Sequence, residues 1–148
     1  MSNTTYEKTV DCLLSRVING DTYQLPEMFT NDSEIHVCLG NQLNSDSFSA
    51  TYIGEKGTLN FLKMCRQMFD FTHITPAEYH LEGHKLIVRG DLECSLIANG
   101  QGWVSGWMQI WTFDKDKISK IRMFADYTAV PRQPNIKLDY AGIRATAN

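Results

Sequence analysis

The segment from Lys85 to Phe113, KLIVRGDLECSLIANGQGWVSGWMQIWTF, carries the clearest strand pattern of the sequence. Apolar residues recur at every second position on both sides of Asn99-Gly100, a pair that is typical of a tight hairpin turn. We therefore predict two strands, Lys85–Ile97 and Trp103–Phe113, that pair antiparallel with each other.

The same period of two continues on either side of this hairpin. Phe71–Leu81 and Lys117–Val130 are predicted as long strands, and the turn residues Gly83-His84 and Asp114–Asp116 separate them from the hairpin. A shorter strand is predicted over Glu34–Leu39. Strands as long as these curl strongly when they lie in one twisted sheet.

Upstream of the long strands, apolar residues are spaced as in helices. Three helices are predicted, over Tyr6–Ile18, Asp21–Phe29 and Leu59–Phe69, and the polar stretch Gly40–Thr51 is predicted as a loop. Helices that precede an antiparallel meander indicate an α+β fold. Three helices on the concave face of a curled sheet would form a cone with a central hydrophobic pocket.

Composition limits the classes of protein to which the chain can belong. Its 148 residues, 43% hydrophobic and 21% charged, suit a globular domain, and the formal charge of −3 argues against a nucleic-acid groove. No apolar run approaches the ~20 residues of a membrane helix, and the polar N-terminus lacks a secretory pattern. Four separated cysteines without a CxxC pair are typical of free thiols. We therefore expect a cytoplasmic protein that binds neither membranes nor nucleic acids.

One domain is expected over residues 1–130. It is followed by a tail over residues 131–148, which contains two prolines and little periodicity. Such a tail is expected to pack on its own domain or on a neighbour.

Several short patterns follow one another in a characteristic order. They are Asn19-Gly20-Asp21, Leu25-x-x-Met28-Phe29, Asn31-Asp32, Tyr52-x-Gly54-x-x-Gly57-x-x-x-Phe61-Leu62, Trp111-x-Phe113-Asp114 and Lys117-Ile118. With these patterns the chain, from Tyr6 to about Val130, resembles the SnoaL-like branch of the nuclear-transport-factor-two-like superfamily. The resemblance implies a cone-shaped α+β fold, often dimeric, with a pocket for a small hydrophobic ligand.

The chemistry does not follow from that resemblance alone, because its members include ketosteroid isomerases, limonene-epoxide hydrolases, polyketide cyclases and scytalone-type dehydratases. The isomerase positions for a tyrosine, a base and an acid are occupied here by Leu13, Val37 and Gln109. The epoxide-hydrolase pattern matches at Arg89-Gly90-Asp91, but Met123 stands where its second carboxylate is expected. Both mechanisms therefore lack essential groups.

A histidine provides the leading catalytic hypothesis. The resemblance to the dehydratases implies a catalytic histidine where the chain enters the sheet, and His73 fits that place. A histidine transfers protons near neutral pH when a carboxylate orients it, which Asp91 or Glu93 would do. The alternative is a structural histidine at a strand end. It also stays open whether Arg89 and Asp91 face the pocket or the solvent, because the opposite parity of their strand is apolar.

Aromatic residues on one parity of the Trp103–Phe113 strand predict ligand contacts. That parity holds Trp103, Ser105, Trp107, Gln109, Trp111 and Phe113. If it lines the pocket, two indoles with an amide between them suit a flat hydrophobic ligand that carries a carbonyl or hydroxyl group. The alternative is core packing. Because the opposite face is apolar as well, we expect a homodimer to cover it.

These patterns lead to the hypothesis of a cofactor-free isomerase, cyclase or lyase that uses acid–base chemistry on a hydrophobic, carbonyl-bearing substrate. Its catalytic residues are predicted to be His73 and Asp91. Its substrate-binding residues are predicted to be Arg89, Trp107, Gln109, Trp111, Met123 and Tyr127. No metal site is expected, because His80 and His84 flank a hairpin turn without a third ligand. The alternatives are a non-catalytic protein that binds a small hydrophobic molecule, and a dimerisation module with a vestigial pocket.

Overall fold

The computed structural model describes residues 3–21, 23–40, 47–98, 100, 102–126, 136–139 and 142–145. In chain order its elements are α1 (Asn3–Asn19), the 3₁₀-helix η1 (Leu25–Met28), β1 (Phe29–Gly40), β2 (Ser47–Ile53), α2 (Gly54–Met68), β3 (Phe69–Glu82), β4 (Lys85–Leu96), β5 (Gly102–Asp114), β6 (Lys117–Asp126), β7 (Ile136–Asp139) and β8 (Gly142–Ala145). None of the helices in these ranges is long and apolar enough to cross a membrane.

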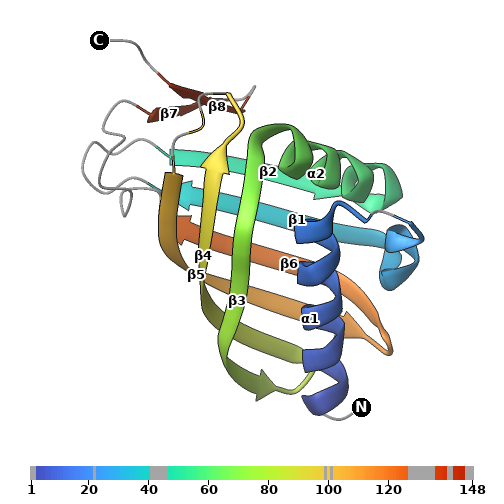
Figure 1. Ribbon diagram of the computed structural model, residues 1–148. Coiled ribbons are helices and arrows are strands. Elements are labelled where there is room, and N and C mark those ends of the chain that lie inside the picture. The colour runs from blue at the N-terminus through green and yellow to red at the C-terminus, as the bar shows by residue number, and fades with distance from the viewer. Residues whose placement is uncertain are drawn as a thin grey trace.

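Six strands form one curved sheet in the order β2-β1-β6-β5-β4-β3. Neighbouring strands are antiparallel except for β1 and β6, which run parallel. Both α-helices lie on the same, concave side of this sheet (Figure 1). The predicted α+β class is therefore confirmed, and so are the strands predicted from the period of two, except that residues 127–130 of the predicted Lys117–Val130 strand lie outside the described residues.

The expectation of three helices is wrong, because the middle one is a single 3₁₀ turn of four residues. The residue before it, Gln24, has a left-handed φ of 54°, and Phe29 after it is already extended. The backbone N–H of Phe29 donates to the Pro26 carbonyl, which closes the turn. The segment between these two residues is too short for the repeated i→i−4 bonds of an α-helix.

The predicted loop over Gly40–Thr51 is also partly wrong. Gly40 ends β1, and Ser47–Thr51 belong to β2, which pairs antiparallel with β1 at the edge of the sheet. Residues 41–46 lie outside the described residues. The sequence of β2 does alternate polar and apolar side chains, so the signal for a strand was present in a short segment that directly follows a polar stretch.

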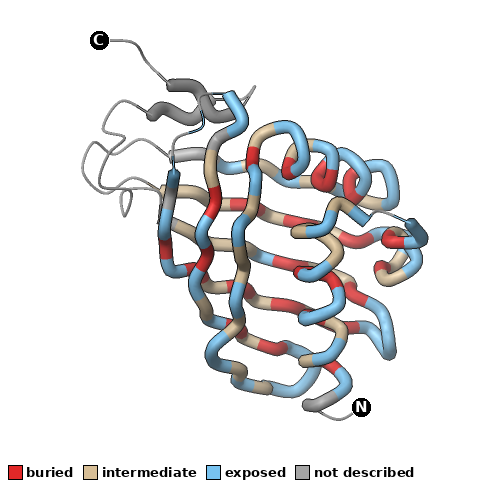
Figure 2. Tube along the Cα trace, viewed as in Figure 1, coloured by how far each residue is buried: buried red, intermediate tan, exposed pale blue. Residues whose placement is uncertain are grey.

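The core lies between the concave face of the sheet and the two α-helices. Helical spacing puts Tyr6, Val10 and Leu13 on one buried face of α1, while buried and exposed positions alternate along the central strands (Figure 2). The rings of Tyr6 and Phe113 stack with their centroids 4.0 Å apart and join α1 to β5. Each large apolar side chain buried in this way contributes about 1.5–3 kcal/mol.

A polar contact fixes α1 against the outermost strand, β3. The hydroxyl of Tyr79 donates to Asp11 Oδ1 at 2.5 Å, and partial burial together with this bond raises the pKa of Tyr79.

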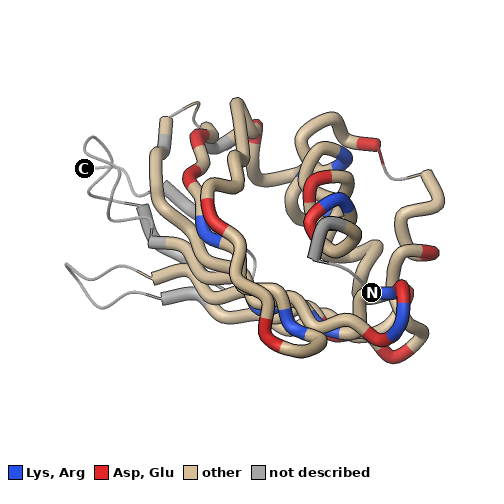
Figure 3. The backbone as a smooth tube through the Cα atoms, turned by 90° about the horizontal axis from the view of Figure 1, so that it is seen from below, with Lys and Arg blue, Asp and Glu red and all other residues tan. Residues whose placement is uncertain are grey.

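Acidic and basic residues are interspersed along the described chain rather than gathered by sign (Figure 3).

The C-terminal segment contains a small hairpin rather than only irregular chain. Strands β7 and β8 pair antiparallel in a separate two-stranded sheet that contacts β2 and α2. The predicted boundary between domain and tail, at residue 130, lies outside the described residues.

Candidate functional site

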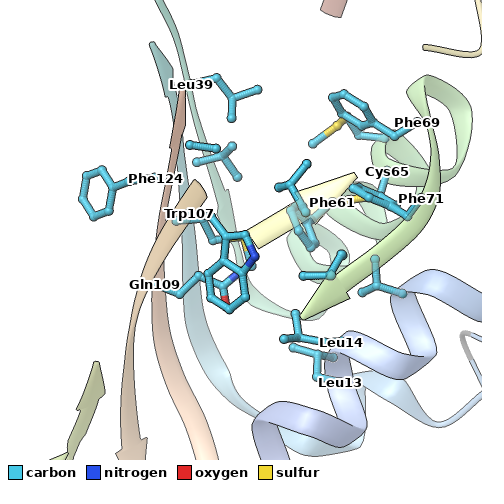
Figure 4. A pocket seen from close by; sticks show the side chains of 17 residues that line it. Leu13, Leu14, Leu39, Phe61, Cys65, Phe69, Phe71, Trp107, Gln109 and Phe124 are labelled. Carbon is cyan, nitrogen blue, oxygen red and sulfur yellow. The ribbon is translucent and has the colours of Figure 1, made fainter. Parts of the chain in front are cut away.

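A cavity of about 100 Å³ lies between the helices and the concave face of the sheet. Its helical wall consists of Leu13, Leu14, Val17, Phe61, Met64 and Cys65. Its sheet wall consists of Val37, Leu39, Phe69, Phe71, Ile74, Leu92, Trp107, Gln109, Met123, Phe124 and Ala125. The ring of Phe124 points away from the cavity, whereas Trp107 projects toward the helical wall (Figure 4).

The orientation of Trp107 is fixed by the neighbouring strand. Its indole Nε1–H donates to the backbone oxygen of Asp91 at 2.8 Å. Trp107 pairs with Gly90 of β4 in the sheet, and a Cβ at position 90 would lie 2.6 Å from the indole ring. That Cβ would also clash with the backbone oxygen of Thr75 in β3. Gly90 therefore leaves the space that the indole occupies.

Gln109 is the one side-chain amide in the described cavity wall, and it is 7% exposed. Its Oε1 accepts a hydrogen bond of 2.9 Å from the Nε1–H of Trp111, which is completely buried. An indole N–H can only donate, so the atom that faces it must be the amide oxygen.

The electrostatic environment of the cavity disfavours charge. Burial raises the pKa of the Cys65 thiol to about 12, and burial together with Cys65 raises the pKa of Tyr52. The described lining residues include no carboxylate, imidazole, ammonium or guanidinium group. A charged ligand would lose its hydration here without gaining a partner.

Three of the predicted substrate-binding residues, Trp107, Gln109 and Met123, line the cavity. Trp111 does not line the cavity, but its indole N–H donates a hydrogen bond to Gln109, which does. Tyr127 lies outside the described residues.

The structure does not bring the remaining predicted residues to the cavity. In β4 the buried positions are Leu86, Val88, Leu92 and Cys94, so the alternate positions of Arg89 and Asp91 are exposed on the other face. Of the two orientations that the sequence left open, Arg89 and Asp91 have the solvent-facing one, so the predicted substrate contact of Arg89 and the predicted catalytic role of Asp91 in the pocket are wrong. The reason is that the helices cover the apolar parity of the strand.

His73 and Asp91 are not a pair. The His73 side chain is 41% exposed, and its Nδ1 lies 3.7 Å from Oε2 of Glu93, the residue opposite it in β4. Asp91 lies opposite Thr75 instead. An irregularity between Phe71 and His73 sets this register, and His73 is not among the cavity-lining residues.

Several cavity residues were not predicted as site residues. They include Leu14, Phe61, Cys65 and Leu92. In the sequence they are marked only by lying on the apolar faces of the helices and on the apolar parity of β4. Core packing produces the same pattern. Gly90 had a clearer signal, since a glycine inside a strand pattern indicates close approach of another group.

Comparison with known proteins supports the fold. No family model and no curated protein sequence matches the chain. An NTF2-like protein from Burkholderia xenovorans LB400 superposes with a TM-score of 0.71 at 20% identity, covering 89% of this chain and 97% of that one. A proposed SnoaL-like polyketide cyclase from Jannaschia sp. CCS1 gives a TM-score of 0.68 at 15% identity, covering 90% and 98%.

A third solved structure is a protein with a ketosteroid isomerase-like fold from Catenulispora acidiphila DSM 44928, in complex with trimethylamine. It superposes with a TM-score of 0.64 at 10% identity and covers 82% of this chain and 88% of that chain. The chain therefore has the NTF2-like fold that the family resemblance implied. This fold supports several kinds of chemistry, so the function has to be argued from the cavity.

Proposed function

We propose that the protein binds a small, neutral, mainly hydrophobic molecule in this cavity and that binding, rather than acid–base catalysis, is its role. The observation that carries the proposal is the composition of the wall. Among the described lining residues, Gln109 is the one amide and Cys65 the one ionisable group, while the rest are apolar or aromatic. Binding sites for small molecules typically combine an apolar wall with a few placed polar groups.

The size of the cavity supports a ligand with a single ring. An apolar protein cavity of about 150 Å³ stays dry and binds benzene. The cavity here, of about 100 Å³, is of the same order. A ligand of about seven non-hydrogen atoms, at about 0.6 kcal/mol for each, would bind with a Kd of about 1 mM.

The described residues of the cavity wall offer no group suited to acid–base catalysis. A general base must lie within hydrogen-bond reach of the proton that it removes, and its pKa should be near the working pH. Cys65, with its pKa raised to about 12, does not meet the second requirement. The Catenulispora acidiphila protein, which has a similar fold, was solved in complex with trimethylamine, and this supports the binding of a small molecule here.

A nuclear magnetic resonance titration tests the proposal. Cyclohexanone, methylenecyclohexane and toluene are added separately, and the indole N–H resonances of the three tryptophans are followed. We expect saturable shifts for at least one compound, largest at Trp107, because its indole projects into the cavity.

His73→Asn is the matched control, because it alters a predicted catalytic residue that does not line the cavity. The Kd of His73→Asn for each compound should equal that of the wild type. Absence of a saturable shift for every compound, up to about ten times the expected Kd, would show that the cavity is not a binding site.

A further inference from the structure

The amide group of the cavity is held in one orientation by a residue behind the wall. Trp111 is completely buried, and its ring stacks on Phe113 with centroids 6.5 Å apart and planes 17° apart. Phe113 stacks in turn on Tyr6 of α1. The indole N–H that donates to Gln109 is therefore fixed by packing from both the sheet and a helix.

Rotation of the amide by 180° is unfavourable while Trp111 is in place. It would bring the Nε2 group of Gln109 toward the indole Nε1–H, so that two donors faced each other in a buried position. A buried donor without an acceptor is costly. The amide oxygen of Gln109 is therefore held in its hydrogen bond to Trp111.

The Nε2 group of Gln109 differs from the amide oxygen in this respect. Among the described residues, none accepts a hydrogen bond from Gln109 Nε2. Gln109 lies beside Trp107 in the cavity wall (Figure 4). Of the described lining residues Gln109 carries the one side-chain amide, and the Nε2 donor is the part of this amide that is left for a ligand.

We infer that Trp111 is a positioning residue that makes the pocket select neutral ring compounds whose polar group accepts a hydrogen bond, such as a ketone. The inference rests on the proposed binding function and deepens it. A ketone oxygen would accept from Nε2 while its ring lies against Trp107. A donor group such as an aromatic amine would meet another donor.

Three ligands with about the same volume test the inference: cyclohexanone, methylenecyclohexane and aniline. Cyclohexanone accepts a hydrogen bond, methylenecyclohexane neither accepts nor donates one, and aniline mainly donates. For the wild type we expect cyclohexanone to bind about tenfold more tightly than either of the others, which is the typical worth of one hydrogen bond. Trp111→Phe keeps an aromatic ring but frees the amide to rotate, so the preference over aniline should fall to about threefold or less.

The ratio between ligands separates positioning from packing. If Trp111 were only structural, its replacement would weaken all three ligands by the same factor and leave the ratios unchanged. Gln109→Met is the second variant, because it keeps the side-chain length and removes the amide. It should abolish the preference for cyclohexanone over methylenecyclohexane, and if Trp111→Phe does not fold, a preference that survives Gln109→Met still overturns the inference.

The possible outcomes distinguish the two proposals. If no compound binds to the wild type, the binding function is wrong and the inference fails with it. If the wild type binds cyclohexanone and methylenecyclohexane equally well, binding stands and the inference is wrong. Ratios that Trp111→Phe leaves at the wild-type values would likewise overturn the inference, and so would ratios that Gln109→Met leaves unchanged.

Discussion

Gly90→Ala is expected to lower the free energy of unfolding by about 3 kcal/mol, although it adds only one methyl group to a strand. The added Cβ would lie 2.6 Å from the Trp107 ring and would clash with the backbone oxygen of Thr75. The latter atom belongs to the sheet backbone and cannot move without breaking the pairing of β3 with β4. Overpacking of this kind outweighs the gain of about 0.5–1 kcal/mol that alanine normally has over glycine in a strand.

Gly106→Ala is the matched control, since Gly106 lies in the neighbouring strand β5, close to Gly90. The nearest atom to its added Cβ would be 3.8 Å away, which is an ordinary contact. We expect its stability to stay within about 0.5 kcal/mol of the wild type. Chemical denaturation of the three proteins provides the comparison. Equal midpoints for Gly90→Ala and Gly106→Ala would refute the packing of Trp107 described above.

The second large effect is expected on binding rather than on stability. Ala125 of β6 lies opposite Trp107 in the sheet and lines the cavity. Ala125→Leu adds three carbon atoms to the cavity. The cavity has a volume of only about 100 Å³, which is about three times the volume of a water molecule in the liquid, about 30 Å³. We therefore expect the Kd of cyclohexanone to rise at least about tenfold, while the free energy of unfolding stays constant or increases by about 1 kcal/mol.

Ala77→Leu provides the control, because Ala77 is exposed on β3 and does not line the cavity. It should leave both the Kd and the stability close to wild type. The same resonance titration and denaturation measurements apply to both variants. Unchanged affinity in a folded Ala125→Leu protein would place the bound ligand elsewhere than in the cavity.

The sequence predicted the sheet because alternation in long strands is a strong signal. In the Trp103–Phe113 segment it left two roles open for the tryptophan parity, core packing and ligand contact, and Trp107 and Gln109 of that parity line the cavity. The same reasoning left the parity of β4 open. A strand with one polar and one apolar face can line either a polar site or a core, and only the position of the helices decides between them.

The candidate catalytic pair could not be judged from the sequence for a related reason. Strand register determines which residue of β4 lies opposite His73, and the irregularity after Phe71 changes it by one position. A sequence pattern of period two carries no information about such a bulge. The result is that His73 lies opposite Glu93 on an exposed face. The homodimer and the cytoplasmic location stay predictions.

A crystal structure of the protein with bound cyclohexanone would show directly where the ligand lies. We expect the ring against Trp107 inside the cavity, with the ketone oxygen about 3 Å from Nε2 of Gln109 while Oε1 keeps its bond to Trp111. A ligand found on the outer face of the sheet near His73 and Asp91, with the cavity unoccupied, would contradict it.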